Sequence, residues 1–245
     1  MLQVVNLRIF KELIKKATFN YAIESLKIDV EDRLIHTSMT NHTKDFIAIL
    51  TKPNNLFMDI DEKFSMNFAN PNTHLLKFIN IFDDELVNYT HEKTYLKLYK
   101  DKIKTKVNFC SNLAVTSYDN VLPETSYDFT ITKDEKFNLM LKKILKLGPL
   151  FDKIYITVKD GTMYIESTDK KINTSHGIEL DVMSVDFKDF NVCFSFQNFN
   201  NLMSITDDGE YMIKMKYKNI NNLDSLLIRV DNETETYYLR SIKDI

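Results

Sequence analysis

One short segment of helical period followed by several segments of strand period recurs four times along the 245 residues of this chain. The apolar residues of each helical segment recur at the three- and four-residue spacing that places them on one helix face. The helices are predicted over 6–19, over 72–82, between Thr132 and Gly148, and over 197–205. Two repeats fill each half, so the sequence predicts two similar domains built on one plan.

Strand-like runs occupy most of the chain between these helices. They are predicted at 22–30, 34–38, 45–51, 63–68, 86–91, 95–99, 103–110, 129–132, 153–159, 163–167, 172–182, 192–196, 211–217, 225–230 and 236–242. Tight turns join several of them, and Lys159-Asp160-Gly161 is a hairpin signal. Antiparallel strands with few helices predict an α+β fold rather than a doubly wound sheet, with both helices of each domain on one face of antiparallel sheets.

The boundaries between elements follow from local signals. Pro71 and Asn72 mark the start of the second helix. Thr132 is predicted to cap the third helix, with Glu135 as its capping-box partner. The stretch 111–126 has no period and is rich in loop formers. We therefore predict an N-terminal domain over 1–112, a connector over 113–126 and a C-terminal domain over 127–245.

Composition restricts the class of protein. With 44% hydrophobic and 27% charged residues, the chain is predicted to be globular and water-soluble, with no membrane span and no secretion signal. Cys110 and Cys193 lie too far apart for a disulfide framework, which predicts an intracellular, reducing location and a buried place for both thiols. That location is the cytoplasm of an infected or host cell if the source is viral, with the nucleus left open.

Positive charge is concentrated on the predicted helices, although the net charge is −3. The candidate DNA-facing residues are Arg8, Lys11, Lys15, Lys16, Lys77, Lys136, Lys142, Lys143 and Lys146. The fourth helix carries asparagines and no basic residue. If the helices share one face, that face is basic, and lysine without much arginine predicts loose, sequence-independent attraction to duplex DNA. Ordinary solvation of a helix face is the alternative.

No catalytic constellation is present in the sequence. The five histidines form no metal-binding pair, and no phosphate-binding glycine–lysine loop occurs. Asp59 and Asp61 fit a pair of metal-binding carboxylates or, more simply, a solvated acidic turn. We therefore predict no catalytic residues, no metal site and no cofactor.

Three segments of the second half, 137–167, 194–205 and 236–245, resemble the C-terminal domain of DNA sliding clamps, both the T4-type bacteriophage clamp and proliferating cell nuclear antigen. They share with that family a helix leading into a hairpin, a strand leading into a short helix, and a final strand with paired tyrosines. In the first half the likeness rests on the first helix and on 34–50, which contains Met39 and His42. The likeness covers the second half more strongly than the first.

The resemblance implies a non-enzymatic polymerase processivity factor that encircles duplex DNA as a ring, with the helices lining the hole. It implies a homotrimer, a DNA polymerase as partner and an ATPase that loads the clamp. The pocket for a partner peptide would comprise Met39, His42, Val121, Leu122, Pro123, Tyr237, Tyr238, Leu239 and Ile242. The subunit interface would comprise Ile103, Thr105, Val107, Phe109, Ile172, Thr174, His176, Ile178 and Leu180.

Two questions stay open at this stage. The period of two in the last strand predicts that Tyr237 and Tyr238 point to opposite faces, so that at least one of them belongs to the core. Two other functions compete with the clamp. One is a monomeric DNA-binding accessory factor of the same fold, and the other is a metal-dependent DNA-processing enzyme that uses Asp59 and Asp61.

Overall fold

The computed structural model of the chain describes residues 3–31, 33–58, 63–118, 126–146, 152–169, 174–181, 189–207, 209–221 and 223–243. The chain divides into two compact units, Met1–Asn120 (unit 1) and Val121–Ile245 (unit 2). Within the described residues no helix is both long and apolar enough to cross a membrane.

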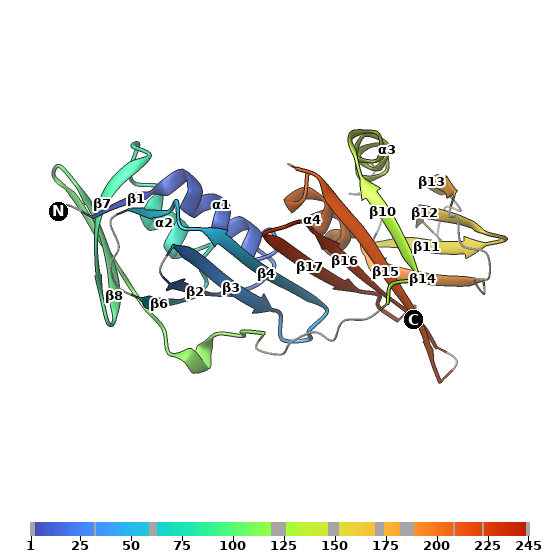
Figure 1. The fold of residues 1–245 in the computed structure, drawn as a ribbon, viewed down its shortest axis with the longest axis horizontal. Coiled ribbons are helices and arrows are strands. Elements are labelled where there is room, and N and C mark those ends of the chain that lie inside the picture. Colours follow the sequence, from blue (N-terminus) through green and yellow to red (C-terminus); the bar gives the residue numbers. More distant parts are fainter. Residues whose placement is uncertain are drawn as a thin grey trace. The chain divides into compact units, whose positions relative to one another are not determined.

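Unit 1 contains two helices and nine strands in its described part (Figure 1). In chain order they are β1 (Val4–Asn6), α1 (Leu7–Ala17), β2 (Ser25–Glu31), β3 (Leu34–Thr40), β4 (Phe46–Pro53), β5 (Phe57–Met58), β6 (Phe64–Ala69), α2 (Leu75–Ile79), β7 (Leu86–Glu92), β8 (Tyr95–Lys100) and β9 (Ile103–Asn108). One sheet has the order β5-β1-β7-β8-β9, and in the other β4, β3, β2 and β6 lie side by side. Neighbouring strands in both sheets are antiparallel.

Unit 2 repeats this plan. Its elements are β10 (Phe129–Lys133), α3 (Glu135–Leu145), β11 (Lys153–Lys159), β12 (Thr162–Asp169), β13 (Thr174–Asp181), β14 (Phe190–Ser195), α4 (Phe196–Ile205), β15 (Tyr211–Ile220), β16 (Leu223–Asp231) and β17 (Glu235–Arg240). One sheet has the order β13-β12-β11-β14, and in the other β10, β15, β16 and β17 lie side by side. The β11–β12 hairpin turns through Asp160 and Gly161, both at positive φ, as its sequence predicted.

Each repeat is one strand, one helix and three further strands, and unit 1 adds the two-residue strand β5 between its two repeats. The leading strand of a repeat does not pair with the three strands that follow it in the same repeat: β1 joins β7, β8 and β9, whereas β6 joins β2, β3 and β4. In unit 2, β10 joins β15–β17 and β14 joins β11–β13. Two repeats therefore complete each other's sheets, which is why the repeats occur in pairs. The α+β fold with antiparallel sheets is confirmed.

The helices form where the apolar spacing predicted them. In α1, Phe10, Leu13 and Ile14 are buried, and the side chain of Asn6 caps the first turn by accepting a hydrogen bond from the Ile9 N–H at 3.1 Å. Helix α2 is shorter than the predicted 72–82, because residues 71–74 form a turn before it and no side chain caps its first residue.

The predicted cap of the third helix was wrong. Thr132 lies inside β10, where it pairs with Met212 of β15, and Asp134 caps α3 by accepting a hydrogen bond from the Phe137 N–H at 2.7 Å. Strand pairing with a distant segment holds Thr132 in extended conformation, so the helix begins two residues later than the capping-box pattern suggests.

Replacing Asp134 with alanine is expected to lower the free energy of unfolding by about 1 kcal/mol, because the first turn of α3 loses its side-chain acceptor. Replacing the exposed Thr132 with alanine is the matched control and is expected to change it by less than about 0.5 kcal/mol. Urea denaturation followed by circular dichroism measures both. Equal effects of the two changes would contradict the assignment of Asp134 as the cap.

Candidate nucleic-acid interface and partner groove

The predicted DNA-facing residues of unit 1 lie on α1 and α2. Arg8 and Lys77 are exposed, and Lys11 and Lys15 are half-buried. Arg8 Nε lies 3.6 Å from a carboxylate oxygen of Glu85. Lys15 stands in the last turn of α1, where a positive charge also stabilises the helix dipole.

Lys16 differs from the other predicted DNA-facing residues. Its side chain is only 11% exposed, and its ammonium lies 3.3 Å from a carboxylate oxygen of Glu12 one helical turn earlier. A buried ammonium with an acidic neighbour offers little charge to a ligand in solution. We therefore leave Lys16 out of the proposed DNA-facing set.

The predicted DNA-facing residues of unit 2 lie on α3 and at its end. Lys136, Lys142, Lys143 and Lys146 are all exposed. Lys142 Nζ lies 2.8 Å from a carboxylate oxygen of Asp207, which follows α4. Helix α4 contains no basic residue, as predicted. Equivalent helices of the two units, α1 and α3, therefore carry most of the exposed positive charge of the four helices.

A groove of about 220 Å³ separates α3 from α4. Its lining residues are Asn138, Leu141, Lys142, Leu145, Lys146, Asn200, Met203, Ser204 and Asp207. The asparagines, the serine and the two lysines supply hydrogen-bond donors without bidentate arginines, while Leu141, Leu145 and Met203 make most of the groove wall apolar. Such donors suit phosphate contact and not base recognition.

Two residues of the predicted partner pocket, Met39 and His42, lie in the described part of unit 1. Met39 is fully buried, and its sulfur accepts a hydrogen bond from the Lys27 N–H at 3.2 Å. His42 is exposed in the β3–β4 turn. The chain after β9 runs beside β3: the Thr40 N–H donates to the Thr116 carbonyl at 3.1 Å, and the Tyr118 N–H donates to the Ser38 carbonyl at 3.0 Å.

These contacts leave a groove of about 410 Å³ in unit 1, which we call the turn groove. It is lined by Ala22, Ile23, Glu24, Ser25, Thr40, Asn41, His42, Thr43, Ala69, Asn70, Ala114 and Thr116. Its wall at Ala22 follows three consecutive non-glycine residues at positive φ, Phe19, Asn20 and Tyr21, with φ of 53°, 52° and 72°. Such backbone is sparsely populated and stores strain. No sequence pattern signalled it.

The two tyrosines of β17 point to opposite faces and both are buried, which agrees with the prediction that at least one of them belongs to the core. Tyr237 points into the core, and its hydroxyl donates to the buried Glu235 carboxylate at 2.8 Å. Tyr238 points to the opposite face, yet is only 5% exposed. The guanidinium of Arg229 lies 5.7 Å from the centre of its ring. Burial raises the pKa of Tyr238 to about 12. Both tyrosines are therefore structural residues, and the hydroxyl of Tyr238 stays protonated at physiological pH.

The remaining members of the predicted pocket fall into three groups. Leu239 is buried, and Ile242 is half-buried, with its N–H donating to the Cys193 carbonyl at 2.8 Å. Val121, Leu122 and Pro123 lie outside the described residues. Of the described pocket residues, His42 is the one that is exposed.

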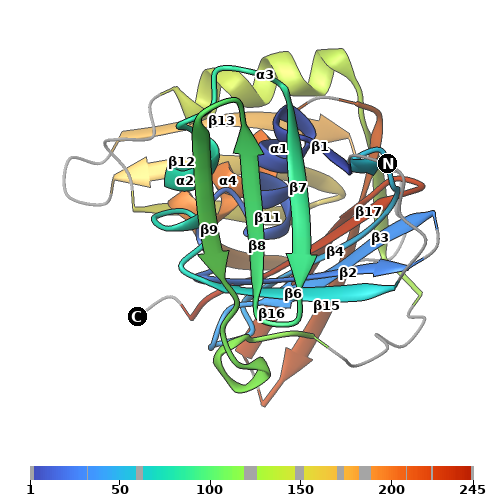
Figure 2. The ribbon, with the colours of Figure 1, turned by 90° about the vertical axis from the view of Figure 1, so that its left-hand side faces the viewer.

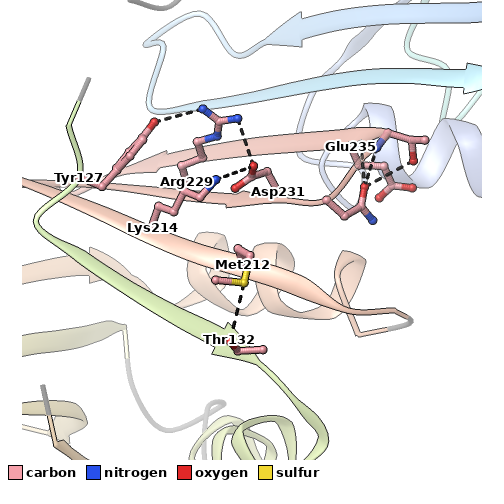
Figure 3. A network of polar contacts seen from close by, with 9 residues as sticks. Tyr127, Thr132, Met212, Lys214, Arg229, Asp231 and Glu235 are labelled. Carbon is pink, nitrogen blue, oxygen red and sulfur yellow. Dashed lines mark hydrogen bonds and ion pairs between the residues drawn. The ribbon is translucent and has the colours of Figure 1, made fainter. Parts of the chain in front are cut away.

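A charged cluster that the sequence did not predict lies on the face of β15–β17 that carries Tyr238 (Figure 3). Asp231 accepts from Arg229 at 3.1 Å and from Lys214 at 3.0 Å. The Arg229 guanidinium also reaches the Tyr127 hydroxyl at 3.4 Å. Two cations share one carboxylate, so the cluster is cationic and fixes the segment at Tyr127 to β16.

The predicted subunit edges are the outer strands of two sheets. β9 ends the five-stranded sheet of unit 1, and β13 ends one sheet of unit 2. On β9, Thr105 and Val107 are buried and Ile103 is exposed, while Phe109 packs edge-on against Phe68 just beyond the strand. On β13, Thr174, His176, Ile178 and Leu180 are strand residues, and Ile172 lies outside the described residues.

The alternative catalytic site gains no support from the described residues. No three His, Cys, Asp or Glu side chains gather closely enough there to hold a metal ion. Asp59 and Asp61 lie outside the described residues. Cys193 is buried as predicted, whereas Cys110 is half-buried, and burial raises the pKa of its thiol.

No family model matches this sequence, and no curated protein matches it. Several solved structures, in contrast, match the fold of this chain. The clamp in a structure of the C-terminal region of FEN-1 bound to A. fulgidus PCNA is similar over 100% of both chains, with a TM-score of 0.66 and 14% identity. The DNA polymerase sliding clamps of Bacillus subtilis and Pseudomonas aeruginosa match with TM-scores of 0.68 and 0.67 at 14% and 11% identity.

The extent of these matches differs between the two kinds of clamp. Our chain is covered completely by both bacterial structures, yet it spans only 65% of the length of either. Against the A. fulgidus clamp the two chains correspond from end to end. The chain therefore has the sliding-clamp fold, which confirms the resemblance found in the sequence, and in extent it corresponds to the A. fulgidus protein.

Proposed function

We propose that this chain is a non-enzymatic DNA sliding clamp, which encircles duplex DNA as a ring and tethers a DNA polymerase to it. The observation that carries the proposal is the end-to-end correspondence of both units with the fold of the A. fulgidus clamp. The basic residues on the equivalent helices α1 and α3 supply the second support, with the lysines of α3 exposed and Lys11 and Lys15 of α1 half-buried.

The charge distribution suits a protein that slides. A clamp that bound phosphates tightly would stop moving, whereas a few lysines give weak, salt-sensitive attraction. Closure of the ring then supplies the residence time, so a net charge of −3 is compatible with DNA as the substrate. A polymerase held by the ring rebinds its primer at high effective concentration, which makes synthesis processive.

Three copies of the chain are proposed for the ring, as the resemblance to sliding clamps implies. The bacterial clamps are longer, since this two-unit chain spans 65% of them. Each copy contributes two units, so a homotrimer would form a ring of six units. The outer strands β9 and β13 are the proposed contacts, because edge-to-edge pairing would extend both sheets and cover their unpaired backbone groups. Opening such a ring requires a loader ATPase.

Partners are proposed to bind at the turn groove. The A. fulgidus clamp was solved with the C-terminal region of FEN-1, which is a short segment of another protein. In this chain the exposed His42, the neighbouring polar residues and the nearby connector make a recess of suitable size for such a segment. Tyr237, Tyr238 and Leu239 of unit 2 are buried and offer no direct contact to a partner.

Retention on DNA with blocked ends tests encirclement without a loader. The protein is allowed to thread onto a linear duplex with biotin at both ends, and streptavidin is then added. We expect the blocked duplex to retain protein many times longer than the open duplex at about 0.5 M salt, where electrostatic binding is largely lost. Equal loss from both, together with a single-chain mass in solution, would show a monomeric accessory factor instead.

A further inference from the structure

The segment from Lys93 to Lys106 is the most basic part of the chain. It contains six lysines and one carboxylate, that of Asp101, in a protein whose net charge is −3. The lysines are Lys93, Lys97, Lys100, Lys102, Lys104 and Lys106. None of them lies on a helix, so the proposed DNA-facing helices do not account for this charge.

Strand register gathers this charge on one face of unit 1. In the β8–β9 hairpin, Lys97 pairs with Lys106 and Tyr99 with Lys104, while Tyr95 is two residues before Lys97 on the same strand. Alternation therefore places Tyr95, Lys97, Tyr99, Lys104 and Lys106 on one face, which we call the lysine–tyrosine face. The other face of the hairpin is core, because Leu96, Leu98, Thr105 and Val107 are buried. Figure 2 looks onto β7, β8 and β9, with α1 and α2 behind them.

Carboxylates neutralise little of this charge. Among the residues that the structure describes, the only ion pair made by these six lysines joins Lys100 to Asp84 at 2.9 Å. The Lys106 ammonium lies 4.0 Å from the centre of the Tyr95 ring, and that of Lys97 lies 5.9 Å from the Tyr99 ring. Both tyrosines are half-buried, so each presents part of its ring at the surface.

Structural roles explain only part of the pattern. Lysines on an outer strand discourage aggregation, and β9 is an outer strand, which accounts for Lys104 and Lys106. Lys93 and Lys102 lie in turns, and Lys97 lies on β8 between two neighbouring strands. Protection of an outer strand against aggregation therefore does not explain these three lysines. Directly opposed like charges such as Lys97 and Lys106 also destabilise a sheet. The face therefore carries a repulsion that a bound polyanion would relieve.

We propose that the lysine–tyrosine face binds single-stranded nucleic acid without sequence preference. Lysines contact the phosphates, and the rings of Tyr95 and Tyr99 provide platforms on which bases stack once the lysine side chains move to the phosphates. The tyrosines favour a single strand over other polyanions, because duplex DNA and acidic peptides present no free base to stack. The face lies outside the helices, so this inference is independent of encirclement.

Fluorescence anisotropy with a labelled 20-nucleotide oligo-dT tests the proposal on the full-length protein. The triple variant Lys97→Gln, Lys104→Gln, Lys106→Gln is expected to bind at least about tenfold more weakly and to lower the slope of log K against log salt by about 2, since each phosphate contact contributes roughly 0.7. Tyr95→Leu with Tyr99→Leu is expected to weaken binding about tenfold and to leave the slope unchanged.

Three comparisons make the result decisive. The variant Lys159→Gln, Lys218→Gln, Lys243→Gln removes the same charge from exposed sites elsewhere and is expected to change affinity by less than about threefold. Circular dichroism verifies that every variant is folded. The proposal is overturned if wild type does not bind oligo-dT, or if both lysine triples weaken binding equally. It is also overturned if poly-glutamate of equal charge competes as well as the oligonucleotide and the tyrosine changes have no effect, which would identify an acidic protein segment as the ligand.

Discussion

Replacing Phe57 with alanine is expected to lower the free energy of unfolding by about 3–5 kcal/mol, which is the usual range for a large aromatic removed from a packed core. Phe57 is 2% exposed. The centre of its ring lies 5.0 Å from that of Tyr89, 5.4 Å from that of Phe64 and 6.0 Å from that of Phe10. These neighbours come from β7, β6 and α1, so this one ring joins both sheets and a helix of unit 1.

The adjacent residue supplies the control. Met58 belongs to the same two-residue strand but is 40% exposed, so Met58→Ala is expected to change the free energy of unfolding by less than about 1 kcal/mol. The chain contains no tryptophan, so circular dichroism and tyrosine fluorescence follow denaturation. Because the chain has two units, two transitions are expected, and Phe57→Ala is expected to shift only one. A loss similar to that of Met58→Ala would contradict the central place of Phe57 in the core.

Sequence period predicted the helices and most strands because each of these elements buries one face of a regular pattern. The short strands β1 and β5, of three and two residues, could not be found in this way, since period two has no meaning over so few residues. β5 exists because Phe57 and Met58 pair with Val5 and Val4, far away in the chain. Nonlocal pairing of this kind, which also overruled the Thr132 cap, is not a local property of the sequence.

In the candidate site, too, some features follow from local sequence pattern and others depend on distant neighbours. Alternation placed Tyr237 and Tyr238 on opposite faces correctly, but the burial of Tyr238 depends on Arg229 of the neighbouring strand, which lies over its ring. Helical spacing placed Lys16 beside Lys15, but only packing shows that Lys16 is buried next to Glu12. Spacing predicts which residues share a face. Whether that face meets solvent depends on neighbours that the pattern does not contain.

The sequence contains a pattern that predicts the lysine–tyrosine face, but the pattern has the period of a strand and not of a helix. The alternating residues of 95–99 and 104–107, separated by a short turn, are typical of a hairpin with one basic and one apolar face. Helical spacing does not group these lysines, because they lie on strands. A search for basic residues at period two identifies Lys97, Lys104 and Lys106 as one surface without coordinates.

The proposed ring assembly through β9 leads to the largest functional effect we expect. In the β8–β9 hairpin the Phe109 N–H donates to the Thr94 carbonyl at 2.8 Å. Antiparallel pairing alternates, so odd-numbered residues of β9 direct their backbone groups toward β8 and even-numbered ones direct them toward the outer edge. The N–H of Lys104 therefore belongs to the edge proposed to pair with a second subunit.

Lys104→Pro removes that edge donor and no hydrogen bond between β8 and β9, so the unit is expected to remain folded. Lost pairing and the bulk of the proline ring are expected to weaken each interface by about tenfold or more, equivalent to roughly 1.4 kcal/mol. A ring with three identical interfaces repeats the defect three times, which weakens closure roughly a thousandfold. Light scattering is expected to show a change from about three chains to a single chain of 28.8 kDa, with loss of retention on end-blocked DNA.

Lys104→Gln is the matched control, because it removes the same charge and keeps the N–H. It is expected to retain the mass of wild type and to remain on end-blocked DNA, even where its affinity for single strands falls. A folded Lys104→Pro protein with the mass of wild type would rule out this strand as the subunit contact, whereas the same loss in both variants would assign assembly to the lysine charge. The two variants differ only in the backbone N–H of residue 104 and in the proline ring. Different masses of the two variants would therefore show that backbone pairing at this edge holds the subunits together.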